Sequence, residues 1–335
     1  MAYTDIDDPS AYFQTTLYTG TGSSLAVTNG GNSDLQPDLV WLKPRGITEG
    51  HFWTDSVRGV QKTIRSYRTN AEETESQGLT AFNSDGFTMG TNSDINTNTE
   101  PGVAWQWKKV AGVFDIQTYA GNSNGSRTVA HNLGVVPSLI IVKNRTNAAD
   151  WFVGSTTSGV SFNWATDYFR LNEAAAKGTD SGGNLFGAVP TDSVFTPGTN
   201  NDMNGSNNNY VAYLFGNKQG VSKVGSYIGN ANADGPFVYL GFKPRFVMTK
   251  RTDNTSDWVL MDSKRNPFNV MDTDLFANST DADTTASNYS VDFLSNGWKF
   301  RGTSGGKNAS GGTYIYMAFA ENPFVTSTGV PATAR

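Results

Sequence analysis

Short runs of aromatic and β-branched residues dominate the chain, and each run is bounded by proline, glycine, asparagine or aspartate. Such runs predict β-strands that are closed by tight turns. Only two stretches have helical character, Thr69 to Gln77 and Leu171 to Lys177, and we expect short helices or long loops there, at the edge of a sheet. The pattern therefore predicts an all-β protein.

An internal repeat organises these strands. A strand that follows a proline and ends in a lysine occurs three times, at 37–43, 137–143 and 244–250. Successive prolines lie 100 and 107 residues apart (137 − 37 and 244 − 137). This period matches the common size of a domain, so each copy could fold as its own domain.

Other landmarks keep the same order in every copy. A Tyr-Xaa-Gly turn precedes the repeated strand, an aromatic strand follows it, and a second aromatic strand closes the copy; these lie at 18–20, 119–121 and 227–229, at 52–56, 151–155 and 258–263, and at 103–107, 210–215 and 314–319. This number of strands per copy indicates two packed antiparallel sheets. We expect three tandem β-sandwich domains, of jelly-roll or lectin-like type, with short helical or loop insertions.

The repeat also sets the expected domain boundaries. They are an N-terminal docking arm at 1–14 and β-sandwich repeats at 15–112, 113–220 and 221–335. The first residues include Asp5, Asp7 and Asp8 and no apolar segment. We therefore expect neither a signal peptide nor a membrane anchor at this end.

Composition excludes several classes of site and partner. The net charge of −5, from 25 basic and 30 acidic side chains, provides no basic surface for nucleic acid or an anionic membrane. The chain has no cysteine, which excludes disulfides, thiolate metal sites and cysteine nucleophiles. Its apolar runs are too short to span a bilayer. We expect a protein that is soluble when made, without a nucleic-acid partner or membrane insertion.

The two histidines, His51 and His131, lie in different repeats and leave no room for a multi-histidine metal site. They also give little support to a Ser-His-Asp triad. His131 precedes a turn, where a hydrogen bond that stabilises the turn is the expected role. His51 occupies the position of Trp151 and Trp258 in the other copies, so a packing role is expected there.

Two short stretches resemble ligand loops but lack essential residues. Asn230 to Gly235 has the start of a calcium loop, yet its twelfth position is Gly241 where a bidentate glutamate is needed. We expect a hairpin turn there. Gly302 to Lys307 resembles a phosphate loop, but Asn308 follows the lysine where serine or threonine is required. We expect a turn before the last strand.

Charged residues provide two further candidates. Asp272, Asp274, Asp281 and Asp283 could supply oxygen ligands or the paired carboxylates of a glycosidase, although the surrounding threonines favour a solvated loop. The repeated basic residues at the strand ends could contact an anionic ligand: Lys43, Arg45, Lys143, Arg145, Lys250 and Arg251. Local ion pairs involving Asp55–Arg58 and Asp262–Arg265 are the simpler account. We therefore assign no catalytic, cofactor-binding or metal-binding residue, and no cofactor.

Over nearly its whole length the chain resembles a family of repetitive virion proteins from marine bacteriophages, often described as tail or lectin-like structural proteins. The matching strings are Ile6 to Phe13, Leu35 to Lys43, Asp55 to Gly59, His131 to Pro137, Lys264 to Asn269 and Tyr314 to Glu321. The resemblance implies a component of the phage particle that is made in the host bacterial cytoplasm. It brings no catalytic residues with it.

These observations together predict a non-enzymatic structural protein of the virion. The favoured role is a tail or tail-fibre component that contributes to attachment to host-surface glycan. Its partners would then be other virion proteins and the glycan, with homo-oligomerisation adding avidity to weak contacts. A capsid decoration protein that docks through Met1 to Phe13 is the alternative, and a polysaccharide depolymerase is the third candidate.

Overall fold

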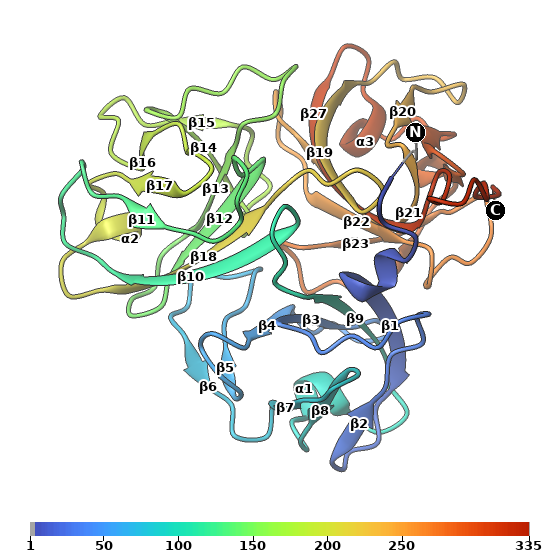
Figure 1. The fold of residues 1–335 in the computed structure, drawn as a ribbon, viewed down its shortest axis with the longest axis horizontal. Helices are drawn as coiled ribbons and strands as arrows, with labels where there is room; N and C mark the ends of the chain where they lie inside the picture. The colour runs from blue at the N-terminus through green and yellow to red at the C-terminus, as the bar shows by residue number, and fades with distance from the viewer. Residues whose placement is uncertain (1–3, 335) are drawn as a thin grey trace.

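The structure, a computed structural model, describes residues 4–334. Its strands form three units, which we call the first (13–107), the second (114–215) and the third (222–323). Figure 1 shows the units as three lobes, coloured blue to teal, green to yellow and orange to red. The fold is all-β, and each unit is a β-sandwich of antiparallel sheets, as the sequence predicts.

The units contain nine strands each within the described residues. The first has β1 (Phe13–Thr19), β2 (Leu25–Val27), β3 (Leu39–Pro44), β4 (Phe52–Asp55), β5 (Lys62–Thr63), β6 (Glu73–Thr74), β7 (Leu79–Phe82), β8 (Phe87–Met89) and β9 (Pro101–Trp107). The second has β10 (Phe114–Ala120), β11 (Val129–Ala130), β12 (Leu139–Asn144), β13 (Trp151–Ser155), β14 (Asp167–Arg170), β15 (Gly178–Thr179), β16 (Phe186–Ala188), β17 (Val194–Pro197) and β18 (Asn209–Phe215). The third has β19 (Ser222–Ile228), β20 (Phe237–Tyr239), β21 (Phe242–Arg251), β22 (Trp258–Asp262), β23 (Thr273–Phe276), β24 (Thr284–Thr285), β25 (Val291–Leu294), β26 (Gly297–Phe300) and β27 (Thr313–Pro323).

Each unit pairs a large sheet with a small one. The large sheets run β10-β18-β12-β13-β14-β15 in the second unit and β19-β27-β21-β22-β23-β24 in the third. The first unit has β1-β9-β3-β4, which a bridge from Trp53 to Ile64 links to the β5-β6 pair. The small sheets run β2-β8-β7, β11-β17-β16 and β20-β26-β25. The common strand order identifies equivalent positions in the three units.

The repeated strands β3, β12 and β21 bury both of their faces, because alternate side chains point in opposite directions. One set packs inside the sandwich of its own unit: Val40, Ile140 and Val247. The alternate set packs into a central core that receives residues from all three units: Trp41, Ile141 and Met248. The large sheets therefore face one another at the middle of the molecule.

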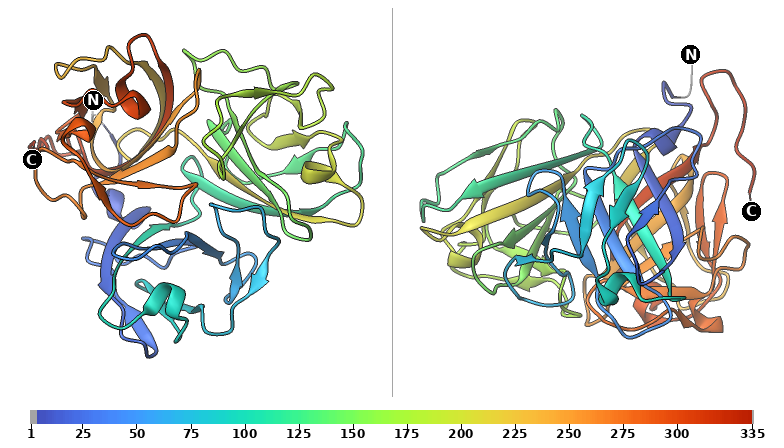
Figure 2. Two further views of the ribbon diagram at one scale, coloured as in Figure 1. Left: turned by 180° about the vertical axis from the view of Figure 1, so that it is seen from behind. Right: turned by 90° about the horizontal axis from the view of Figure 1, so that it is seen from below.

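This common core replaces the row of separate domains that the repeat suggested. Figures 1 and 2 show the lobes around a shared centre, with a pseudo-three-fold arrangement. The N-terminal segment also lies against the body, since Ile6 is buried and the Thr4 hydroxyl donates to the carbonyl of Gln219. Phe13 and Gln14, placed in the predicted arm, are the first residues of β1.

The three repeated lysines connect neighbouring units. Each ammonium is buried and donates to the carbonyl six residues ahead in its own unit and to a carbonyl of the preceding unit in the ring: Lys43 to Glu49 and Thr280, Lys143 to Ala149 and Thr69, and Lys250 to Ser256 and Ala174. Burial lowers the pKa of each lysine to about 8. The lysines thus close a ring of contacts between the units rather than forming the ion pairs favoured from the sequence.

Predicted ion pairs do form in the first unit, but at a buried junction. The Arg58 and Asp55 side chains are both 0% exposed, and Arg58 also pairs with Glu72 at 3.2 Å. From the second unit, Arg145 pairs with Glu72 at 2.8 Å and the Tyr213 hydroxyl donates to Asp55 at 2.8 Å. This network joins the first and second units.

An equivalent network joins the third unit to the first: Asp262, Arg265 and Asp283 with Arg45 and Trp105. The junction between the second and third units differs at every corresponding position. The shared strand order, and the hydrogen bond from the Lys177 N–H to the Thr252 carbonyl, identify the residues at these positions. They are Ser155, Ser158, Lys177, Thr252 and Met317. Lys177 instead pairs with Asp167 inside the second unit, at 2.5 Å.

Neither stretch is helical, so of the two expected alternatives, a short helix or a long loop, the helix does not form. Residues 69–77 contain β6, and 171–177 form a loop before β15. The reason lies in the backbone, because the carbonyls of Thr69 and Ala174 accept hydrogen bonds from the lysine and a backbone N–H of the neighbouring unit. They are therefore not available to close helical turns.

The helices of the described chain are short. They are the one-turn helices α1 (Ser93–Asn96), α2 (Asn201–Asn204) and α3 (Gly305–Asn308), with the 3₁₀ turns η1 (Pro9–Ala11) and η2 (Ser287–Tyr289). None of these helices is long and apolar enough to cross a membrane. The expected turn at 302–307 thus includes the start of α3.

Each one-turn helix ends in a buried asparagine that holds the loop after the Tyr-Xaa-Gly turn. The side chains of Asn96, Asn204 and Asn308 accept from a loop N–H and donate to loop carbonyls. The hairpin predicted at 230–235 is therefore wrong. The strands on either side pair elsewhere, β19 with β27 and β20 with β26, because this loop crosses from the large sheet to the small one.

Candidate ligand-binding groove

The largest hollows among the described pockets lie side by side on the third unit. Their volumes are about 370 and 380 Å³, and both are lined by Asn217, Lys223 and Tyr239. We call the combined depression the aromatic groove. Its lining also includes Ser158, Lys218, Gly225, Ser226, Phe237 and Tyr316. Each hollow falls within the usual size range of a small-ligand site.

Strand β20 presents two aromatic rings to this groove. Phe237 and Tyr239 are 44% and 47% exposed, whereas Val238 between them is buried. This alternation follows from the two-residue period of a strand, in which Val238 packs in the core and its neighbours point outward. The groove therefore has an exposed aromatic wall on a strand that is fixed by pairing with β26.

These rings are specific to the third unit. Strand pairing places Val238 opposite Trp298, as it places Val27 opposite Phe87 and Val129 opposite Phe195. The residues equivalent to Phe237 and Tyr239 are then small: Ala26 and Thr28 in the first unit, and Thr128 and Ala130 in the second. The third unit thus has two large rings at positions where each of the other units has two small side chains.

A third aromatic residue forms the floor. Tyr316 on β27 replaces Ala104 and Ala212 of the other units, as the pairing of each last strand shows. Opposite it stands Gly225, where an added Cβ would lie 2.3 Å from the Tyr316 hydroxyl oxygen. The glycine is required because this hydroxyl fills the space that a side chain would occupy. Burial raises the pKa of Tyr316 above its usual value, so the phenol stays protonated.

Lys223 supplies a positive charge to the groove. Its ammonium donates to the Tyr239 carbonyl at 2.8 Å and lies 5.3 Å from the centre of the Tyr239 ring. Burial lowers the pKa of Lys223. Lys218 also lines the groove, and among the described residues neither hollow is lined by aspartate or glutamate.

The second unit closes one end of the groove. The Ser226 hydroxyl donates to the Ser158 carbonyl at 2.7 Å, which fixes the loop of the second unit against β19. Ser158 stands where Arg58 and Arg265 stand in the other units, so the junction without the buried ion network is the one beside the groove. The added aromatic residues and the missing ion network thus occur at the same place in the molecule.

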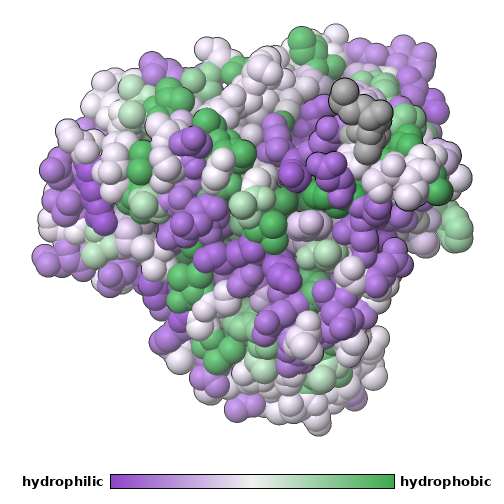
Figure 3. Space-filling model, viewed as in Figure 1, coloured by the Kyte–Doolittle hydropathy of each residue, from purple (hydrophilic) through white to green (hydrophobic). Residues whose placement is uncertain are grey.

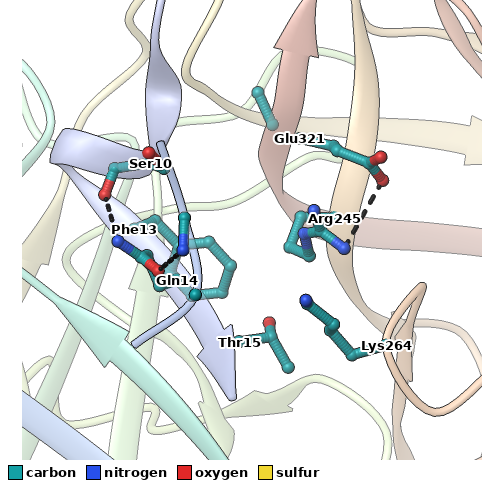
Figure 4. Close-up of a pocket in the computed structure, with 10 residues that line it drawn as sticks. Ser10, Phe13, Gln14, Thr15, Arg245, Lys264 and Glu321 are labelled. Carbon is teal, nitrogen blue, oxygen red and sulfur yellow. Dashed lines mark hydrogen bonds and ion pairs between the residues drawn. The ribbon is translucent and has the colours of Figure 1, made fainter. Parts of the chain in front are cut away.

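A second, narrower hollow is shown in Figure 4. It has a volume of about 30 Å³ and lies between the start of β1 and the third unit. On one side of the gap, Gln14 donates to the Ser10 carbonyl at 3.0 Å; on the other side, Arg245 lies 3.6 Å from Glu321 (Figure 4). Its volume is about that of one bound water, so the aromatic groove is the stronger candidate for a ligand.

The acidic residues singled out in the sequence serve separate purposes. Asp274 is buried with Lys307, at 2.7 Å from the ammonium, beside a hollow of about 200 Å³. Asp283 pairs with Arg45 and Arg265 at the junction of the third and first units. Within the described residues no group of three potential metal ligands occurs. The expected solvated loop is therefore wrong for these two aspartates.

Both histidines have the local roles expected of them. His131 accepts a hydrogen bond from the Leu133 N–H at 3.3 Å and contacts the Thr191 carbonyl through its other ring nitrogen at 3.2 Å. His51 is fully buried among aromatic rings, including Trp41 and Trp105. Neither histidine lines the aromatic groove.

Sequence reasoning missed the aromatic groove because the loops that lead to it differ in length. From the Tyr-Xaa-Gly glycine to the buried valine there are seven, eight and nine residues in the three units (27 − 20, 129 − 121 and 238 − 229). The strings therefore do not align without the strand pairing. A signal was present, since Phe237 and Tyr239 alternate with a valine and have no aromatic counterparts in the other copies.

Comparison with known proteins gives the family but no activity. One family model matches residues 8–323, which include all three units. A comparison with curated proteins finds no match. Because the family model covers most of the chain, the chain belongs to the family described as a domain of unknown function, DUF7483.

Proposed function

We propose that this chain is a non-enzymatic structural protein of a bacteriophage particle, in the tail or tail fibres, and that its third unit binds host-surface glycan in the aromatic groove. The resemblance of the sequence to phage virion proteins supports the location. The observation that carries the binding role is the group of aromatic residues that only the third unit has: Phe237, Tyr239 and Tyr316.

The chemistry of the groove suits a sugar. A pyranose has an apolar face that packs on an aromatic ring and hydroxyls that need hydrogen-bond partners. Phe237 and Tyr239 offer exposed rings, while Asn217, Ser226 and the Tyr316 hydroxyl offer polar atoms. The wall is held by a paired strand, which limits the loss of conformational entropy when a ligand binds.

The test is binding of the purified chain to host envelope polysaccharide, measured by calorimetry. The groove variant carries Phe237→Ala with Tyr239→Thr, the residues of the first unit at these positions. We expect its affinity to fall at least about tenfold, because exposed aromatic anchors carry much of the energy at such sites. Phe268→Ala is the matched control, since Phe268 is 77% exposed and lies outside the groove lining.

Two outcomes would contradict the proposal. Equal loss of binding in the groove variant and the Phe268→Ala control would remove the groove from the binding role. Release of reducing sugar by the wild-type chain would replace attachment with polysaccharide cleavage. Melting temperatures within a few degrees of wild type would show that both variants are folded.

Capsid decoration is a second candidate, and the pseudo-three-fold shape of the molecule favours it. A body with three similar lobes suits a three-fold position of a symmetric shell. The segment from Thr4 to Phe13 contacts the body itself, so docking would use another surface. A reconstruction of the intact particle separates the candidates: density on the tail supports attachment, and density on the head lattice supports decoration.

A further inference from the structure

We infer that the aromatic groove selects an anionic saccharide, whose sugar rings carry carboxylate or sulfate groups. This inference rests on the proposed glycan-binding function and specifies its ligand class. It is carried by the position and surroundings of Lys223, by the composition of the groove lining and by the contrast with the other two units.

The charge of the lining differs from that of the whole molecule. The chain has more acidic than basic side chains, 30 against 25, and a net charge of −5. Yet the described lining of both hollows contains Lys218 and Lys223 and no carboxylate. A positive site in a negative protein attracts an anion locally, whereas a neutral sugar gains nothing from it.

The Lys223 ammonium can donate further hydrogen bonds to a ligand. An ammonium carries three N–H donors, and the hydrogen bond seen for this one goes to the Tyr239 carbonyl. Partial burial disfavours the charged form, and this is the cause of the lowered pKa of Lys223. A bound anion would offset that cost by providing the opposite charge that the protein does not place there.

The equivalent residues in the other units have local structural roles. Gln14 donates to the carbonyls of Ser10 and Ser33, at 3.0 and 2.8 Å. Asp115 accepts from the Asn132 N–H at 2.7 Å. Both residues fasten a neighbouring loop, whereas Lys223 lies beside an exposed ring in the groove. The change of charge thus occurs in the same unit as the added aromatic residues.

Charge and aromatic surface lie together at Tyr239. The Lys223 ammonium lies 5.3 Å from the centre of the Tyr239 ring. A sugar that packs against the exposed rings of this lining, at Phe237 or at the edge of Tyr239, would place an acidic substituent near the ammonium. Aromatic packing and a charge-assisted hydrogen bond would then act on one residue of the glycan, which is the basis for selecting charged over neutral sugars.

The experiment measures binding of the full chain to polygalacturonate, to dextran sulfate and to neutral dextran. Lys223→Gln, which introduces the first unit's residue, is compared with Lys62→Gln, a lysine of the first unit that contacts Thr74. We expect polygalacturonate or dextran sulfate to bind, dextran not to bind, and the Lys223→Gln variant to lose about tenfold in affinity. Binding should weaken with added salt, because screening reduces the attraction.

The two acidic polymers distinguish a carboxylate from a sulfate as the group that is recognised. Loss of acidic-polymer affinity in Lys223→Gln and in the Phe237→Ala, Tyr239→Thr variant, but not in Lys62→Gln, supports the inference. Dextran binding that is unaffected by Lys223→Gln would overturn it and leave the proposed glycan binding in place. Acidic-polymer binding that is equally weakened by both lysine variants would overturn it as general charge attraction. No binding to these polymers or to host polysaccharide would overturn both.

Discussion

His51 keeps the hydrogen bond to the preceding unit that a tryptophan makes at the same position in the other two units. The Trp41 indole N–H donates to His51 Nδ1 at 2.7 Å, so His51 Nε2 carries the hydrogen and donates to the Phe276 carbonyl at 2.9 Å. In the other units, Trp151 and Trp258 donate to the equivalent carbonyls of the preceding unit. The smaller ring fits because Trp41 is larger than its counterparts Ile141 and Met248.

The buried histidines predict acid sensitivity. Burial lowers the pKa of His51 well below 6.5, and it lowers that of His131 as well. Below pH 6.5 the unfolded chain therefore binds protons that the folded chain does not, and stability falls as the pH falls. We expect up to about 1.4 kcal/mol per pH unit from His51, and less from His131.

Urea unfolding at several values between pH 7.5 and pH 5 measures this effect above the range in which most carboxylates titrate. The His51→Gln variant should show a shallower dependence than wild type. A free energy of unfolding that stays constant over this range in the wild-type chain would contradict the assignment of neutral, buried histidines.

At the scale of elements, helix α3 carries an exception to the repeat. The residue before its buried asparagine is Lys307, where the other one-turn helices have Ile95 and Met203. Its partner Asp274 stands at the position of Thr63 and Tyr168. Both charged side chains are 2% exposed, and burial raises the pKa of Asp274 and lowers that of Lys307.

This pair predicts strong coupling between two substitutions. Lys307→Met alone leaves Asp274 buried without its partner and should cost about 3–5 kcal/mol of stability. Adding Asp274→Thr removes the isolated carboxylate and should recover much of that loss. A double-mutant cycle from urea unfolding measures the coupling. Additive effects of the two substitutions would show that the pair is not a stabilising unit.

The elements also show where sequence reasoning succeeds. The strands ending in Lys43, Lys143 and Lys250 were predicted because period, boundary residues and β-branched content agree. At 171–177 a short helix or a long loop was expected, and the loop forms because the Ala174 carbonyl binds another unit, which local propensity does not register. Local propensity also does not show that Lys250 is buried, because this burial depends on the second unit, whose position relative to the third cannot be read from the sequence.

At the scale of the whole molecule, the shared core makes the three units depend on one another. The inward faces of the large sheets are covered by the other two units, and residues such as Ile141, Val153 and Tyr213 are 0% exposed. The sequence alone could not predict this arrangement. An apolar face has the same pattern whether it covers its own second sheet or the sheets of two neighbours.

The shared core predicts that one unit does not fold by itself. A fragment of residues 113–220 would expose the inward face of its large sheet, so we expect no cooperative thermal transition and exposed apolar surface detected by dye binding. The full chain should unfold in one transition. A monomeric fragment that melts cooperatively would contradict this view and restore three independent domains.

The joining of the three lobes in one polypeptide also has a consequence for how such a surface can diversify. In a ring of three identical chains, any substitution appears three times. A buried charge such as Lys307, or an exposed ring such as Tyr239, would then be repeated in every lobe. A single chain is free of this constraint, so two lobes can keep their compact surfaces while the third changes. The lobes of this single chain can therefore acquire different functions, whereas the lobes of a symmetric trimer cannot.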